Sequence, residues 1–134
     1  MWRSGVARRR QQTAVSQMIE SAQRTGDHTT PWRSTPAVWE FFADESDLLR
    51  HLQQTWRNAL AGAVYVAIES GDGDLQSDVA KAFSTVSRRH AGLRRVLEAN
   101  ADHPAIASAM RKERSLLASF ATLTGGDALE GLAA

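Results

Sequence analysis

Apolar residues recur at three- and four-residue spacing along most of this chain, which is the pattern of amphipathic helices. The first stripe predicts a helix over residues 6–24 and consists of Ala14, Val15, Met18, Ile19 and Ala22. Residues 8–12 lack apolar side chains, so this end of the helix is expected to protrude. Residues 25–31 are rich in turn formers and predict a break. The pair Thr35-Pro36 then predicts the start of a short helical element over residues 36–43.

The strongest pattern predicts a long central helix over about residues 45–69. Its start is marked by the acidic run 44–47, which supplies a cap and first-turn carboxylates. Its stripe consists of Leu49, Leu52, Trp56, Ala59, Ala63 and Val66. Beyond Asn58 the helix is apolar on almost every side, a pattern typical of a buried helix. Small residues at 59, 62, 63 and 67 would let another helix approach closely, either from the same chain or from a second subunit.

Two further helices follow the central one. Gly71 suits the left-handed position after a helix, and Asp74 caps the next element. The stripe of this element is Leu75, Val79, Phe83, Val86 and His90. Gly92 is expected to interrupt or kink the helix, and the period continues beyond it to Leu97. After a break at residues 100–104, the last stripe buries Ile106, Met110, Leu117, Phe120 and Leu123, and Gly125-Gly126 ends it.

These elements predict an all-α, single-domain antiparallel helical bundle of five to six helices around the central helix at about 45–69. The domain spans residues 1–126, with a basic N-terminal helix and linker at 1–30 and the bundle core at 31–126. Residues 127–134 are expected to form a flexible tail. The 134 residues leave no room for a second independent core.

Composition narrows the chemistry that is available. The chain has no cysteine, which excludes disulfides, thiol nucleophiles and thiolate metal sites. It has no Gly-rich phosphate loop and no helical Glu-x-x-His pair, so we expect no cofactor and no metal, and the balance leans away from an enzyme. The longest apolar run, residues 59–68, is half of the roughly twenty residues that a spanning helix needs. We therefore expect no membrane insertion and a cytoplasmic location.

Arginines dominate the basic residues, at fourteen against two lysines, a bias typical of GC-rich bacterial coding sequences. Charge is segregated: residues 40–80 carry a net −6, and residues 81–114 a net +5. The candidate anion- or nucleic-acid-binding residues are Arg8, Arg9, Arg10, Arg88, Arg89, Arg94 and Arg95. Guanidinium groups suit phosphate and carboxylate because they donate two parallel hydrogen bonds. The alternative is that these arginines form a solvent-exposed helix face whose positive charge balances the acidic residues of 40–80.

A cluster of aromatic residues lies ahead of the central helix. Trp32, Trp39 and Phe42 fall within eleven residues and are candidate anchors for a protein partner, because Trp and Phe are enriched in interfaces. The alternative is that these rings cover the bundle core. One histidine also has a potential partner: His51 follows Asp47 by four residues, so the two can meet on a helix face, where we expect a surface pair.

Three functions remain open from the sequence. The leading hypothesis is a non-enzymatic helical protein that acts through protein–protein interaction, with a protein partner or a homodimer. The second is binding of nucleic-acid phosphates through the arginine clusters. The third is a small-ligand or catalytic bundle whose pocket is lined by Arg57, His90 or Arg94.

Overall fold

The computed structural model describes the backbone of residues 2–71 and 73–123 and the side chains of residues 5–71 and 73–119. Over this part of the chain it is all-helical and without strands, which confirms the predicted fold class. The five α-helices are α1 (Trp2–Thr25), α2 (Glu45–Ser70), α3 (Leu75–Arg89), α4 (Ala91–Ala99) and α5 (Ala107–Leu123). Two short 3-10 helices, η1 (Pro31–Ser34) and η2 (Pro36–Glu40), precede α2. The predicted burial of Phe120 and Leu123 and the predicted tail at 127–134 lie outside the described residues.

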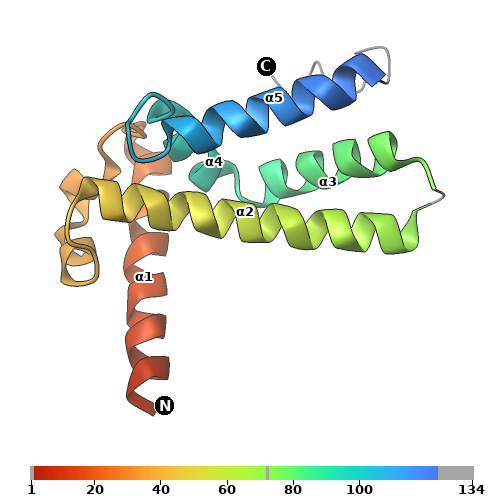
Figure 1. Cartoon of the computed structure of the whole chain (residues 1–134). Coiled ribbons are helices and arrows are strands. Elements are labelled where there is room, and N and C mark those ends of the chain that lie inside the picture. The colour runs from red at the N-terminus through yellow and green to blue at the C-terminus, as the bar shows by residue number, and fades with distance from the viewer. Residues whose placement is uncertain (1, 72, 124–134) are drawn as a thin grey trace.

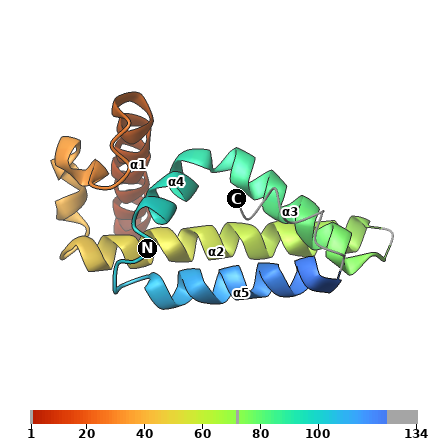
Figure 2. The same ribbon diagram turned by 90° about the horizontal axis from the view of Figure 1, so that it is seen from above.

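The long helix α2 forms the axis of the molecule (Figure 1). After a short turn, α3 returns antiparallel beside it, and these two helices share the most extensive contact between elements. Viewed from above, α3 and α5 flank α2 on different sides (Figure 2). Helix α1 crosses the beginning of α2 steeply, and α4 lies near this crossing (Figures 1 and 2). The elements therefore converge at one end of α2, while its other end extends away with α3 packed beside it.

The hydrophobic core sits at the end of α2 where the elements converge. The core residues of α2 are Leu48, Leu49, Leu52 and Trp56, and each of these side chains is fully buried. The other elements contribute Ala14, Met18, Ala22, Trp32, Val38, Phe42, Phe83, Val86, Leu93, Val96, Leu97, Ile106, Met110 and Leu117. The predicted stripes therefore supply most of the core.

The prediction that the second half of α2 is buried is wrong. Tyr65 is 67% exposed, Val66 62% and Ile68 47%. The physical reason is that this stretch extends past α1 and α4, so that α3 is the helix that packs closely along it (Figure 1). A helix that is apolar all round needs neighbours all round to be buried, and here part of its circumference has none among the described residues.

Both predicted acidic caps are confirmed. The carboxylate of Asp44 accepts a hydrogen bond from the backbone N–H of Asp47 at 2.8 Å. The carboxylate of Asp74 accepts one from the N–H of Ser77 at 3.3 Å. Each cap satisfies an N–H group that the first turn of a helix leaves without a partner. These local interactions define where α2 and α3 begin.

Two predicted breaks differ from the structure. The interruption predicted at Gly92 is present but lies two residues earlier, since α3 ends at Arg89 and α4 begins at Ala91, after His90. Gly71 is not left-handed, since its φ is −83°; Gly73, at +97°, takes that conformation. What Gly71 provides instead is room, because the carboxylate of Asp78 packs against its Cα, where a side chain would stand.

Gly92 is needed for the contact between α1 and α4. A Cβ at this position would stand 2.5 Å from Cγ2 of Ile19 and 3.2 Å from Cγ of Gln23. We expect Gly92→Ala to destabilise the protein by about 1–3 kcal/mol through overpacking. Gly62→Ala is the matched control, because open space surrounds Gly62 on α2, and alanine there should stabilise by up to about 1 kcal/mol. Urea unfolding followed by circular dichroism measures both, and equal stability of Gly92→Ala and the parent would contradict the contact.

Candidate functional site: a groove between α2 and α3

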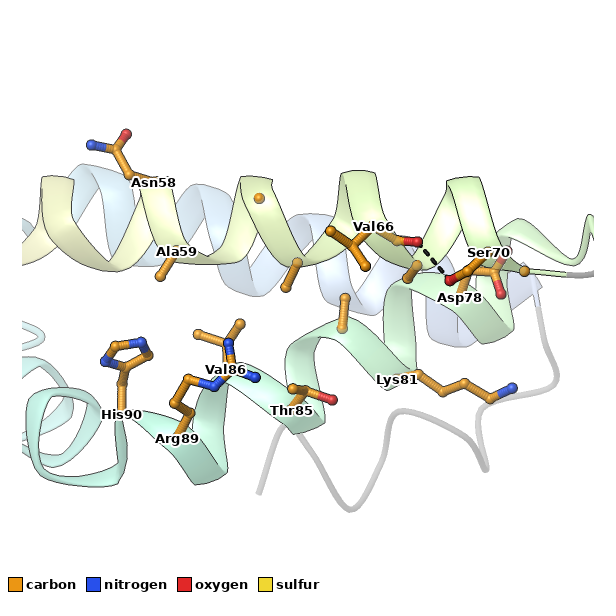
Figure 3. A pocket seen from close by; sticks show the side chains of 15 residues that line it. Asn58, Ala59, Val66, Ser70, Asp78, Lys81, Thr85, Val86, Arg89 and His90 are labelled. Carbon is orange, nitrogen blue, oxygen red and sulfur yellow. Dashed lines mark hydrogen bonds between the residues drawn. The ribbon is translucent and has the colours of Figure 1, made fainter.

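A groove with a volume of about 620 Å³ runs between α2 and α3 (Figure 3). The α2 side presents one face of that helix: Asn58, Ala59, Gly62, Ala63, Val66, Ala67 and Ser70. The α3 side presents Asp78, Lys81, Ala82, Thr85, Val86, Arg89 and His90. The residues fall at three- and four-residue spacing on both helices because each helix turns one face toward the groove.

The floor of the groove is apolar, and its charged residues come from α3. Ala82 and Val86 are buried, and the alanines of α2 are half-buried. Arg89 and His90 extend from the end of α3 toward α2 (Figure 3). Lys81 and Arg89 are exposed, and within the described part of the chain neither forms a salt bridge. At the far end lies Asp78, which is only 4% exposed because its carboxylate is tucked against Gly71.

Several large apolar side chains are exposed on the described helices, and one of them, Val66, lines the groove. Tyr65 and Ile68 project from the same stretch of α2, and all three are largely exposed. Leu75 at the start of α3 and Leu116 on α5 are also exposed, at 46% and 58%. The sequence did identify these apolar residues of α2, but it assigned them to the interior.

A second cleft, also of about 620 Å³, lies where α1 meets α2 and α4. Its charged and titratable lining residues are Arg8, Glu20, His51, Arg89 and His90. Arg89 and His90 line both hollows, so the cleft and the groove meet at the junction of α3 and α4. The two arginine clusters of the sequence thus contribute one residue each, Arg8 and Arg89, to a single cleft.

One of the two histidines in this cleft, His51, lies in a partly apolar environment. The ring of His51 lies 5.0 Å from that of Phe42, measured between centroids. Burial lowers the pKa of His51 below its ordinary value of 6.5, and the nearby carboxylate of Asp47 opposes this shift. The predicted pairing of Asp47 with His51 is therefore present as an electrostatic interaction.

This shift predicts a pH dependence of stability. Because the folded pKa of His51 lies below the unfolded one, the unfolded chain binds the proton more tightly between these two values. The free energy of unfolding should therefore fall as the pH drops below about 6.5. Replacing His51 by glutamine should flatten this part of the profile, as measured by urea unfolding at a series of pH values. Superimposable profiles for the parent and His51→Gln would contradict the assignment.

The predicted arginines have divided environments. Arg8, Arg9, Arg88, Arg89 and Arg95 are exposed. Arg10 pairs with Glu40 at 2.9 Å, and its guanidinium lies 5.7 Å from the ring centroid of Phe41. Arg94 is mostly buried and pairs with both Glu98 and Glu113. Arg10 and Arg94 are thus paired within the fold, but Arg10 stays at the surface, so six of the seven predicted arginines are exposed.

The predicted aromatic anchors are divided as well. Trp32 and Phe42 are 6% and 5% exposed and belong to the core, whereas Trp39 is 38% exposed. The rings of Trp32 and Trp39 lie 6.4 Å apart, so the buried ring supports the exposed one. Partner binding through these residues remains a prediction, and only Trp39 presents substantial surface for it.

Sequence reasoning did not find a network that joins four helices. The indole N–H of Trp56 donates to Oε1 of Glu113 at 2.7 Å, and Nη1 of Arg94 donates to Oε2 of the same carboxylate at 2.6 Å. The Arg94 guanidinium also lies 4.8 Å from the ring centroid of Trp56 and 5.4 Å from that of Phe83. No spacing in the sequence connects Trp56 with a glutamate 57 residues away.

The residues proposed for a ligand pocket are not brought together. Arg57 is exposed, Arg94 lines a surface hollow with His28 and Glu98, and His90 lines the groove and the second cleft. Among the described residues, no three histidine, aspartate or glutamate side chains gather closely enough to hold a metal ion. Within the same part of the chain, no helix has the length and apolarity needed to cross a membrane.

Comparison of the chain with protein-family models, with characterised proteins and with solved structures finds no match.

Proposed function

We propose that this protein acts by binding another protein chain, through the groove between α2 and α3 and the exposed apolar side chains of the same stretch of α2. The observation that supports this most directly is the exposure of Tyr65, Val66 and Ile68 within four residues of one helix. Single exposed apolar residues are ordinary on soluble proteins, but grouped ones mark sites of interaction. Covering this exposed apolar surface of α2 with a partner would lower the free energy of the system.

The surroundings of these residues also suit an interface. Tyrosine is enriched among residues that dominate binding energy, and Tyr65 is the most exposed of the three. An apolar centre with a polar rim is the usual arrangement of protein interfaces, and here Lys81 and Arg89 supply charge at the edge of an apolar floor.

The test is capture of a partner by tagged full-length protein from the cytoplasmic fraction of its own host, the compartment that the sequence predicts. The parent is compared with Tyr65→Gln/Ile68→Gln after chemical crosslinking and nuclease treatment. Leu116→Gln is the matched control, because Leu116 is equally apolar and exposed but lies on α5. We expect a stoichiometric protein with the parent and the control, and its loss with the α2 variant.

Three results would contradict this proposal. Equal capture by all three proteins would show that the α2 surface is not the interface. If the parent protein is a monodisperse monomer and retains no other protein, the proposed function is contradicted. Loss of the partner with Trp39→Gln, but not with the α2 variant, would place the interface at the aromatic cluster instead.

A second function is favoured by the meeting of Arg8 and Arg89 in one cleft. Two guanidinium groups from distant parts of the chain could there contact consecutive phosphates of a nucleic acid. Binding of a labelled DNA duplex should then weaken with salt, and Arg8→Ser/Arg89→Ser should reduce the slope of log K against log salt by about 1.8. Salt-insensitive binding, or an unchanged slope in the variant, would contradict this function.

A further inference from the structure

We infer that the groove receives a single amphipathic helix of the partner, carrying carboxylates along the flank that faces α3; this inference rests on the proposed function. The groove and the second cleft meet at Arg89 and His90. Together they follow α2 from His51 to Ser70. Nineteen helical steps span about 28 Å, which is the length of a helix of about nineteen residues.

The floor allows a helix to approach closely. Ala59, Ala63 and Ala67 succeed one another at four-residue spacing on α2, and Ala82 lies opposite them on α3. Side chains of this size bring helix axes to the short end of the usual separation of about 8–10 Å. A partner helix would thus pack between α2 and α3 and would cover Val66, which lines the groove while being 62% exposed.

The charge of the walls selects an acidic partner. Lys81, Arg89 and Arg8 line the two hollows, and none of them forms a salt bridge with the described residues. The lining carboxylates are Asp78 and Glu20. Asp78 is turned into the protein against Gly71, so it does not offset the cations at the surface. A helix with carboxylates on one flank would pair with these cations, and a basic helix would meet like charge.

The spacing of the cations constrains the partner further. Lys81 and Arg89 are eight residues apart on the same face of α3, which places them about 12 Å apart along its axis. A helix lying alongside α3 meets both when its own carboxylates are seven or eight residues apart. A partner with this spacing and a stripe of small apolar residues therefore fits the groove in both shape and charge.

The experiment uses synthetic, fluorescently labelled 18-residue helical peptides and the full-length protein. One peptide carries an Ala/Leu stripe and two glutamates eight residues apart; the second has lysines in place of the glutamates. We expect the glutamate peptide to bind, to shift amide NMR signals of residues 59–70 and 78–90, and to bind about tenfold more weakly to Lys81→Glu/Arg89→Glu. Arg88→Glu/Arg95→Glu is the control with equal charge change outside both hollows, and it should bind the glutamate peptide more tightly than the groove variant does.

Several outcomes would overturn the inference. Equal binding of the glutamate and lysine peptides would contradict the inference that the partner helix carries carboxylates on one flank. Equal weakening by both charge-reversed pairs would show that only the net charge of the protein matters. Shifts confined to other surfaces would place the peptide elsewhere. Sedimentation that shows a dimer disrupted by Ala63→Trp would assign the groove to a second copy of this chain. Loss of capture with the Tyr65/Ile68 variant, without peptide binding, would leave the proposed function standing and the acidic helix wrong.

Discussion

Replacing Trp56 with alanine is expected to lower the free energy of unfolding by about 3–5 kcal/mol. Trp56 is fully buried at the point where the helices converge. Its ring meets that of Phe83 edge-on, with centroids 5.8 Å apart, and the Arg94 guanidinium lies over it. Alanine would leave a cavity that the surrounding helices are too rigid to close. It would also remove the indole N–H that donates a hydrogen bond to Glu113.

The matched control for Trp56→Ala is Tyr65→Ala. Both residues are aromatic and lie on α2, but Tyr65 is 67% exposed. Removing its side chain should change stability by no more than about 0.5 kcal/mol. Urea unfolding of the parent and both variants measures the contrast. A loss in Tyr65→Ala as large as that in Trp56→Ala would contradict the difference in burial between the two halves of the helix.

The parts of the fold that the sequence predicts correctly are those set by local interactions. Asp44 and Asp74 cap their helices through N–H groups three residues away, so the information lies within one turn. The stripe of Leu49, Leu52 and Trp56 also predicts its own burial correctly, because several elements converge on that part of α2.

The errors arise where the outcome depends on distant residues. Periodicity identifies Val66 and Ile68 as apolar, but it contains no information on whether a neighbour exists to cover them. The placement of Gly92 is a similar case. A glycine inside a helical pattern suggests an interruption or a kink at the glycine itself, whereas here it provides space for Ile19 of α1 and the break falls two residues earlier.

The candidate site combines both kinds of information. The small residues of α2 and the basic residues of α3 can be read from the chain, but the groove they form requires the pairing of two helices. Neither the pairing of Arg94 with Glu113 nor the meeting of Arg8 with Arg89 follows from spacing. Arginine clusters therefore do not predict which guanidinium groups remain available for a ligand; the carboxylates around them decide that.

Replacing Glu113 with alanine is expected to destabilise the protein by about 2–4 kcal/mol, a large effect for a residue on a polar face. Its carboxylate accepts from both the indole of Trp56 and Nη1 of Arg94, and its side chain is only 12% exposed. Removal of this carboxylate leaves the buried indole N–H of Trp56 without an acceptor and leaves Glu98 as the remaining salt-bridge partner of Arg94. Because α5 is held to α2 and α4 through this carboxylate, its amide hydrogen exchange should also accelerate in the variant.

A double-mutant cycle separates this network from simple loss of packing. Trp56→Phe removes the indole N–H and keeps an aromatic ring, so Glu113→Ala should cost less in that background than in the parent. Arg10→Ala/Glu40→Ala provides the surface comparison, since that pair is 64% and 57% exposed and should contribute at most about 1 kcal/mol. Strict additivity of Trp56→Phe and Glu113→Ala would contradict the hydrogen bond between them. A positive coupling would show that the carboxylate of Glu113 holds α5 against one side of α2, which leaves the side facing the groove open to a partner.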